Sequence, residues 1–184
     1  MKKEDVYRNA LLMLNINYDD IKSNPSSMEI STCKSFYTLA FNECSTARKW
    51  SFLMASYTFD DFEFSSELED LNYKAKVPED MNYICMLNGE YNRSYRIIGE
   101  YIYCDVEPRS IQYISNDIDI TDCPEMFGML VACMLASDIA PFISPDSNMQ
   151  SKCISQYQIR LSELSKFDEM STRKRNLTVE EMII

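Results

Sequence analysis

The chain of 184 residues contains no histidine and only three glycines. Without histidine it cannot form a Ser-His or Cys-His nucleophile pair, a histidine general base or a histidine-containing zinc site. Glycine occurs only as Gly89, Gly99 and Gly128, so a glycine-rich phosphate-binding loop is excluded. The P-loop, dinucleotide-binding, GxSxG and DxDxDG signatures are also absent. We therefore expect no catalytic, cofactor-binding or metal-binding residues.

Cysteine is present, but not in a pattern that predicts disulfides or a metal site. The seven cysteines are an odd number, no pair has CxxC spacing, and most lie on apolar stripes. This distribution predicts small buried side chains in a reducing compartment. The first fourteen residues carry several charges and no long apolar run, which argues against a signal peptide.

The net charge of −11 disfavours general affinity for nucleic acid or acidic membranes. The content of 46% hydrophobic residues excludes global disorder, and the length suits one domain, or one domain with an insertion. The carboxylate pairs Asp60-Asp61 and Glu79-Asp80 occur in acidic segments. We interpret both pairs as parts of solvated loops and not as catalytic or metal-binding groups.

The most apolar stretch predicts a buried helix over residues 124–140. Asp122 is placed to act as its N-cap, Pro124 suits its first turn, and Pro141 is expected to end it. Its apolar and small residues together cover nearly the whole circumference: Phe127, Gly128, Leu130, Val131, Ala132, Cys133, Met134, Leu135, Ala136 and Ile139. The helical part spans roughly 22 Å against about 30 Å of membrane hydrocarbon, and it contains Asp138. A core helix is therefore favoured over a membrane span, with Asp138 a satisfied polar group or an inter-subunit partner.

Three further helices are expected at residues 4–15, 25–54 and 145–168, and the second of them would be about 45 Å long. Between the second and third helices the hydrophobic period changes to that of strands. The expected strands lie at 57–64 with a phase slip, 74–77, 83–87, 95–98, 101–104 and 111–114, with a turn at Asn88-Gly89. The predicted fold class is α+β: a bundle of about four helices, one of them long, with a β-rich insertion between helices 2 and 3.

The helical pattern stops after Phe167, and the remaining residues combine a basic cluster with apolar side chains. We take eight of them as candidate docking residues: Arg173, Lys174, Arg175, Leu177, Val179, Met182, Ile183 and Ile184. An apolar end on a polar tail commonly needs a surface on which to dock. A frayed terminus is the alternative.

A series of short motifs occurs in order along the chain. Trp50-Ser51-Phe52 ends the long helix, and a Tyr-x-x-x-x-Pro-x-Asp segment follows at 73–80. YRIIGEYIY at 95–103, IQYI at 111–114 and CPEMF at 123–127 precede the buried and terminal helices. Over residues 4–168 this order resembles tail tubular protein A and related head-to-tail connector proteins of short-tailed bacteriophages. The usage of Tyr, Asn, Ser, Ile and Lys suits a phage of an AT-rich host, such as a crAss-like phage.

The resemblance implies a structural virion protein without enzymatic activity. Its subunits would form a ring, a dodecamer of 12 copies, that binds beneath the portal protein and joins downstream tail or ring proteins. Genomic DNA would pass through the ring during ejection without sequence-specific binding, and the acidic balance would let it slide. The implied location is the neck of the virion, after assembly in the host bacterial cytoplasm, with no cofactor and no membrane partner.

The same resemblance gives the organisation of the chain. Residues 1–168 would form a single connector domain, with a helical bundle at 1–55 and 121–168 and a β-rich insertion at 56–120. Residues 169–184 would form an extended C-terminal tail. Because C-terminal segments of this family often reach the portal, the eight tail residues become candidate portal-docking residues. The short chain and the acidic loop at 60–70 depart from the family, so contacts on the tail side are not implied.

Two alternatives remain open. One is a peptidoglycan-degrading tail component, and the other is a cytosolic interaction adaptor that docks through an exposed helix. A glycosidase requires two carboxyl groups at a defined separation, one of them with a raised pKa, and no local pattern indicates such a pair. A gene position beside a portal or major capsid protein would separate the connector from the adaptor.

Overall fold

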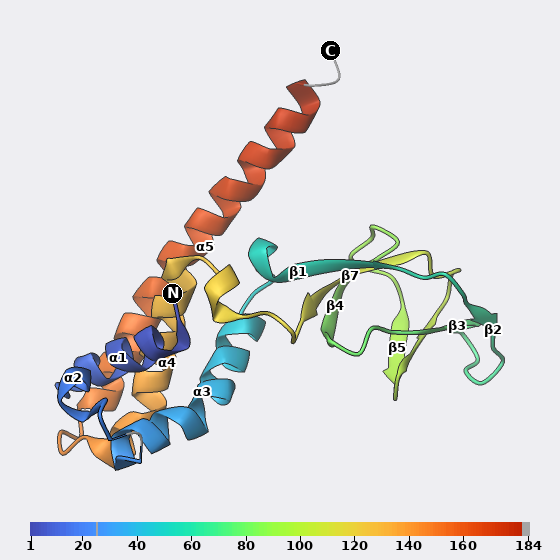
Figure 1. Ribbon diagram of the computed structural model, residues 1–184. Coiled ribbons are helices and arrows are strands. Elements are labelled where there is room, and N and C mark those ends of the chain that lie inside the picture. Colours follow the sequence, from blue (N-terminus) through green and yellow to red (C-terminus); the bar gives the residue numbers. More distant parts are fainter. Residues whose placement is uncertain (25, 182–184) are drawn as a thin grey trace. The chain divides into compact units, whose positions relative to one another are not determined.

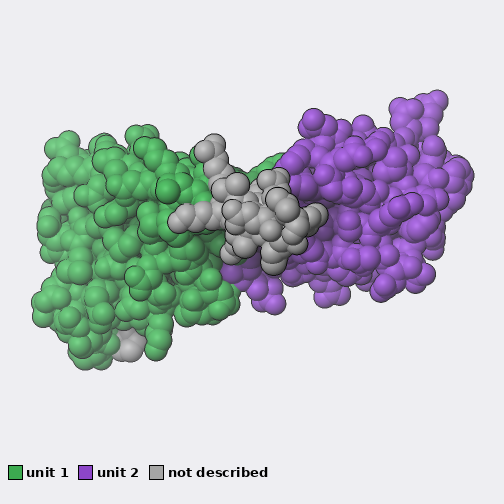
Figure 2. Space-filling model, turned by 90° about the horizontal axis from the view of Figure 1, so that it is seen from above, with its two compact units in different colours: residues 1–52, 119–184 green, residues 53–118 purple. Residues whose placement is uncertain are grey.

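The computed structural model describes residues 1–24 and 26–181, with side chains described as far as Ser171. The chain forms two compact units, which are coloured separately in Figure 2. We call Met1–Phe52 together with Asp119–Ile184 the helical unit, and Leu53–Ile118 the sheet unit. Each unit is described by itself below.

Over its described residues, the helical unit contains five α-helices (Figure 1). In chain order they are α1 (Lys3–Met13), α2 (Tyr18–Ile21), α3 (Met28–Thr46), α4 (Glu125–Ile143) and α5 (Met149–Glu181), with a 3₁₀ turn at Ile120–Asp122 before α4. Helices α1, α3 and α5 all pack against α4. The helix with the most apolar sequence is therefore the centre of this unit.

Burial of α4 follows from its sequence, because it has no polar face to turn toward water. Phe127, Leu130, Val131, Leu135 and Ile139 are completely inaccessible to solvent. By length and composition, α4 is the one described helix that could cross a membrane. That is weak evidence, because the core helix of a globular protein passes the same test and most of α4 is buried in the protein.

The end of α3 is fixed by Trp50, which folds back onto the helix. Its indole Nε1 donates a 2.8 Å hydrogen bond to the main-chain carbonyl of Cys44, one of the last carbonyls that α3 leaves without an intrahelical partner. The fully buried ring stacks on Phe52, and both contact Phe127 of α4 edge-on. The tryptophan thus caps one helix and packs against another.

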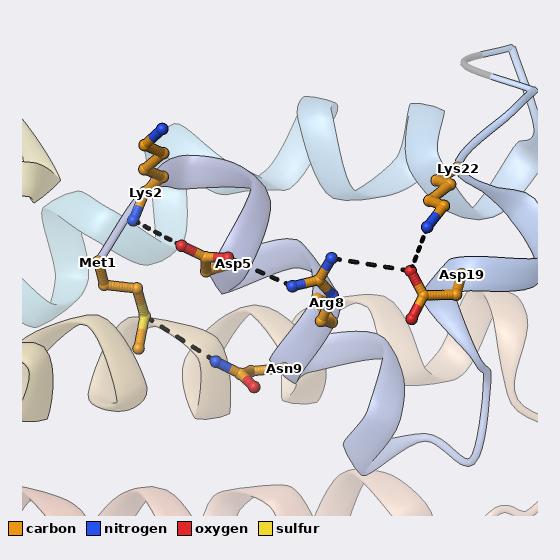
Figure 3. Close-up of polar contacts among 7 residues, drawn as sticks. All are labelled: Met1, Lys2, Asp5, Arg8, Asn9, Asp19 and Lys22. Atoms are coloured by element: carbon orange, nitrogen blue, oxygen red, sulfur yellow. Dashed lines mark hydrogen bonds and ion pairs between the residues drawn. The ribbon is translucent and has the colours of Figure 1, made fainter.

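A polar network joins α1 to α2 at the surface (Figure 3). The main-chain N–H of Lys2 donates to the Asp5 carboxylate at 3.0 Å, at the start of α1. The Arg8 guanidinium lies between Asp5 and Asp19, at 3.5 and 3.7 Å, and Lys22 contacts Asp19 at 2.7 Å. These exposed ion pairs orient the short helix α2, which is too short to be stable alone.

The sheet unit contains seven strands in two antiparallel sheets. They are β1 (Met54–Thr58), β2 (Glu63–Phe64), β3 (Tyr73–Lys76), β4 (Met81–Leu87), β5 (Tyr95–Ile98), β6 (Tyr101–Cys104) and β7 (Ser110–Ser115). The strand order is β1-β7-β4 in one sheet and β2-β3-β6-β5 in the other. Both sheets contribute to one core, in which Ile84 and Ile111 of the first meet Ile102 and Ala75 of the second.

Two tight turns in this unit depend on left-handed backbone. Asn88 and Gly89 have φ values of 52° and 81°, the conformation that Asn-Gly pairs favour in hairpins. The Asn88 side chain also accepts hydrogen bonds from the main-chain N–H groups of Arg109 and Ser110, at 2.7 and 3.1 Å. Gly99, with φ of 59°, begins the turn that joins β5 to β6. The turn predicted at Asn88-Gly89 is confirmed.

The predicted fold arrangement is wrong. The protein is α+β, but its described residues form five α-helices and two antiparallel sheets, not a bundle of about four helices with one β-rich insertion. The fifth helix, α2, lies where a break was expected. The long helix expected at 25–54 ends at Thr46, because Trp50 turns the chain back, and the longest described helix is instead α5 with 33 residues.

Several helix boundaries also differ from prediction. Helix α4 passes through Pro141 and continues to Ile143, since a proline within the last turn removes a single hydrogen bond. Its N-cap is Pro124, while Asp122 lies in the preceding 3₁₀ turn. Helix α5 continues past residue 168 to Glu181, where an extended tail was expected.

Replacing Trp50 with phenylalanine removes both the cap on Cys44 and part of a buried ring. We expect Trp50→Phe to lower the free energy of unfolding by about 2 to 3 kcal/mol, from one lost hydrogen bond and a new cavity. Urea denaturation followed by circular dichroism measures this change. Leu39→Ala, at a side chain that is 49% exposed, is the matched control and should cost well under half as much. Equal losses would show that Trp50 has no special role.

Candidate functional site

The eight candidate docking residues lie where the structure describes no side chains. The main chain of residues 173–181 belongs to α5, and Met182, Ile183 and Ile184 are outside the described residues altogether. Their proposed contacts with a portal therefore stay a prediction.

Hydrogen bonds and an ion pair connect α5 to the rest of the helical unit at residues 168 and 169. The buried Asp168 carboxylate accepts hydrogen bonds from the main-chain N–H and the hydroxyl group of Ser51. The neighbouring Glu169 contacts Arg48 at 3.0 Å. These two pairs join α5 to the segment that follows α3.

Helix α5 also exposes large apolar side chains outside the face that packs on α4. The buried residues Cys153, Leu164 and Asp168 mark the inner face. Ile159 and Met170 are eleven residues apart, and at about 100° per residue they lie on the same side of the helix, roughly opposite that inner face. Phe167 lies about 60° from Met170 around the helix, on the flank between that side and the inner face. These three side chains, Ile159, Met170 and Phe167, are 59%, 62% and 47% exposed.

Sequence reasoning missed these three exposed side chains, Ile159, Phe167 and Met170, which together we call the outer face of α5. The prediction followed only the inner stripe, and it ended the helix at 168, before Met170. The eleven-residue spacing from Ile159 to Met170 was the available signal, because it returns to the same helix face after about three turns.

Charge is distributed unevenly between the units. The sheet unit has thirteen acidic residues and five basic ones, which gives it a net charge of −8 out of the total of −11. The outer strands of its four-stranded sheet expose large side chains, with Phe64 at 74% and Tyr95 at 38% exposure. This unit therefore combines strong negative charge with uncovered aromatic groups at the two ends of one sheet.

The two acidic pairs, Asp60-Asp61 and Glu79-Asp80, differ in their surroundings. Asp80 accepts hydrogen bonds from the hydroxyl groups of Tyr113 at 3.1 Å and Ser115 at 2.6 Å, so its carboxylate braces β7. Asp60 and Asp61 are exposed, as expected for a solvated loop. Among the described residues, no group of three or more His, Cys, Asp or Glu side chains is arranged to hold a metal ion.

All seven cysteines are buried, as predicted, and none of them is joined in a disulfide. Burial raises the pKa of Cys33 to about 12 and the pKa values of Cys104 and Cys133 to about 11. A thiol with such a pKa holds almost no thiolate at neutral pH, and the thiolate is the nucleophilic form. These cysteines act as small apolar side chains.

Asp138 of α4 is the one described carboxyl group whose environment raises its pKa. Burial, with a smaller contribution from Glu43, raises this pKa to about 6. Its Oδ2 atom is buried and has no hydrogen-bond partner among the described residues. The alternative in which this side chain is satisfied within the subunit is therefore wrong for Oδ2, while a role as an inter-subunit partner stays a prediction.

Comparison with known proteins gives no match: no model of a known protein family fits the chain, and no characterised protein is similar to it.

The Asp138 carboxyl group predicts a stability change that depends on pH. Its pKa is higher in the folded state than the ordinary value of 3.8, so its ionisation destabilises the fold as pH rises through about 6. Asp138→Asn should therefore stabilise the protein at pH 8 by about 1 kcal/mol, after allowance for partial exposure, and change little at pH 4. Chemical denaturation at the two pH values measures this.

The control is Asp146→Asn. Hydrogen bonds from the main-chain N–H of Asn148 and from Lys152 lower the pKa of Asp146, so the sign is reversed and this variant should lose stability at pH 8. If Asp138→Asn gave the same change at pH 4 and pH 8, the effect would not come from titration of Asp138.

Proposed function

We propose that this chain is a structural subunit of a bacteriophage head-to-tail connector, and that its copies form a ring between the portal and the tail. The ordered motifs over residues 4–168 support this proposal, and the outer face of α5 is the observation that carries it. A subunit built for assembly needs apolar surface that its own fold leaves uncovered. Ile159, Phe167 and Met170 provide such a surface on the longest described helix.

Burial of the outer face in an assembly would be favourable. Each of the three side chains is roughly half exposed, and covering the remainder would contribute on the order of 1 kcal/mol per side chain. That gain is modest for one contact, but in a closed ring every subunit makes the contact twice, once with each neighbour. Weak pairwise association then suffices for a stable assembly at the portal.

The charge distribution supports a role beside DNA without binding to it. Lys and Arg side chains that neutralise phosphates dominate the affinity of proteins for DNA. In the sheet unit acidic residues outnumber basic ones by thirteen to five, so its mean field repels a phosphate backbone. Such a surface could line a channel through which DNA slides.

The outer face of α5 can be tested by introducing charge. Ile159→Lys combined with Met170→Lys should abolish ring formation with a portal protein, since burying two unpaired charges costs several kcal/mol. Gln158→Lys, at an exposed polar position of the same helix, is the matched control and should assemble normally. Negative-stain microscopy and mass photometry measure assembly. Unchanged rings with both variants would place the interface elsewhere.

Truncation after Ser171 tests the eight predicted docking residues. We expect the melting temperature to stay within about 2 °C, because the contacts that Asp168 and Glu169 of α5 make with their own unit are kept. We expect portal binding to weaken at least tenfold, as measured by co-sedimentation or calorimetry. If the truncated chain bound the portal as tightly as the full chain, these residues would not be the docking element.

A further inference from the structure

We propose that the four-stranded sheet of the sheet unit continues from one copy of this chain to the next, with β2 of one copy pairing antiparallel with β5 of its neighbour. This inference rests on the proposed ring and identifies one of its interfaces. It follows from the residues at the two free ends of the sheet, which complement each other in register, in direction and in charge.

Two rows of side chains cross this sheet from end to end. Directly opposed residues share a face, and the first row is Glu63, Lys74, Tyr103 and Arg96. The second row, on the opposite face, is Phe64, Tyr73, Cys104 and Tyr95. The first row therefore begins with an acid and ends with a base, and the second begins and ends with an aromatic residue.

The strand directions permit the same rows to continue into another copy. In the order β2-β3-β6-β5 every pairing is antiparallel, so β2 and β5 run in opposite directions. A second copy added in the same orientation places its β2 antiparallel to β5. If the two rows continue into the next copy without a shift, Arg96 lies opposite Glu63 of that copy, and Tyr95 lies opposite its Phe64.

Both ends of the sheet are free to make these contacts. Each outer strand has one hydrogen-bonded neighbour, and its other edge therefore carries unpaired N–H and C=O groups. All four residues of β5 and both residues of β2 are exposed, and Phe64 has 74% of its surface in contact with solvent. Among the described residues, neither Glu63 nor Arg96 forms an ion pair.

Charge complementarity selects a second copy in this head-to-tail orientation. Asp60, Asp61 and Glu63 lie at or next to β2, whereas Arg96 is the charged residue of β5. Pairing β5 with another β5 would bring Arg96 side chains to the same edge, and pairing β2 with another β2 would oppose three acidic residues. Like charges directly opposed across strands are destabilising. The contact is therefore heterologous, the type that generates a ring when the rotation between copies closes.

The proposal is tested by cysteine cross-linking of the full-length chain. Glu63→Cys and Arg96→Cys variants are prepared separately and then mixed, alone and with the portal, under mild oxidation. A disulfide should form in the mixture and in neither variant alone, because opposed Cβ atoms across a strand pair approach to about 5 Å. Within one chain these positions are three strand spacings apart, about 14 Å, which excludes an intramolecular bond. The native cysteines are all buried, and the parent chain is the control.

A charge exchange provides a second, independent readout. Arg96→Glu and Glu63→Lys should each weaken self-association roughly tenfold, as measured by the concentration dependence of mass, because each places like charges across the contact. Glu63→Lys also faces Lys74 of its own chain, so its folding is checked by circular dichroism. The double variant carries both changes in one chain and restores an opposite-charge pair at every contact. It should recover most of the lost association, which a variant that merely misfolds could not do.

The outcomes separate this interface from the proposed function. Rings that form with the portal but give no cross-link between positions 63 and 96 would overturn the sheet pairing and leave the connector role standing. A disulfide between two chains that both carry Arg96→Cys, or between two that both carry Glu63→Cys, would overturn it in favour of a two-fold contact. Failure of every variant and of the parent chain to self-associate, even with the portal, would overturn both proposals.

Discussion

Burial of α4 is the constraint on which the helical unit depends. An apolar helix with Leu130, Val131 and Leu135 on several sides cannot be stable in water until neighbours surround it. Helices α1, α3 and α5 supply that cover, and Ser51, in the segment after α3, hydrogen-bonds to Asp168 of α5. The covering helices have polar outer surfaces for the most part, so the apolar residues that stay uncovered on them stand out as surface for another molecule.

The elements that could be predicted from sequence are those with a purely local cause. The buried core helix follows from composition alone, and strands β5 and β6 follow from the aromatic and β-branched residues on either side of the Gly99 turn. The failures have tertiary causes. The periodicity of α3 continues past residue 46, but an indole that bonds to the Cys44 carbonyl ends the helix there. No local pattern contains that contact, and without it the predicted length of the second helix was wrong.

The candidate surfaces were less predictable than the fold. The residues after 171 were predicted to dock because a basic cluster and apolar side chains follow the end of the periodic pattern. The outer face of α5 was not predicted, because the apolar stripe on the inner face is stronger. The ends of the sheet could not be found from sequence, because strand order decides which strands are outermost. Glu63 and Arg96 are 33 residues apart in the chain, and only the register through Lys74 and Tyr103 shows that they occupy one row.

Open sheet edges can pair with other chains and cause aggregation, and proteins limit this pairing with short edge strands and charged residues. Both devices occur here, since β2 has only two residues and the segment before it is acidic. The acidic segment does not repel every possible partner strand equally. Three acids at one end repel an identical end, but they attract the end that carries Arg96. The same charges that prevent indiscriminate pairing thus leave one orientation favourable, and because sheets twist, repeated addition in that orientation rotates each copy relative to the last. A sheet end protected in this way is limited to head-to-tail assembly, which is the geometry that a ring requires.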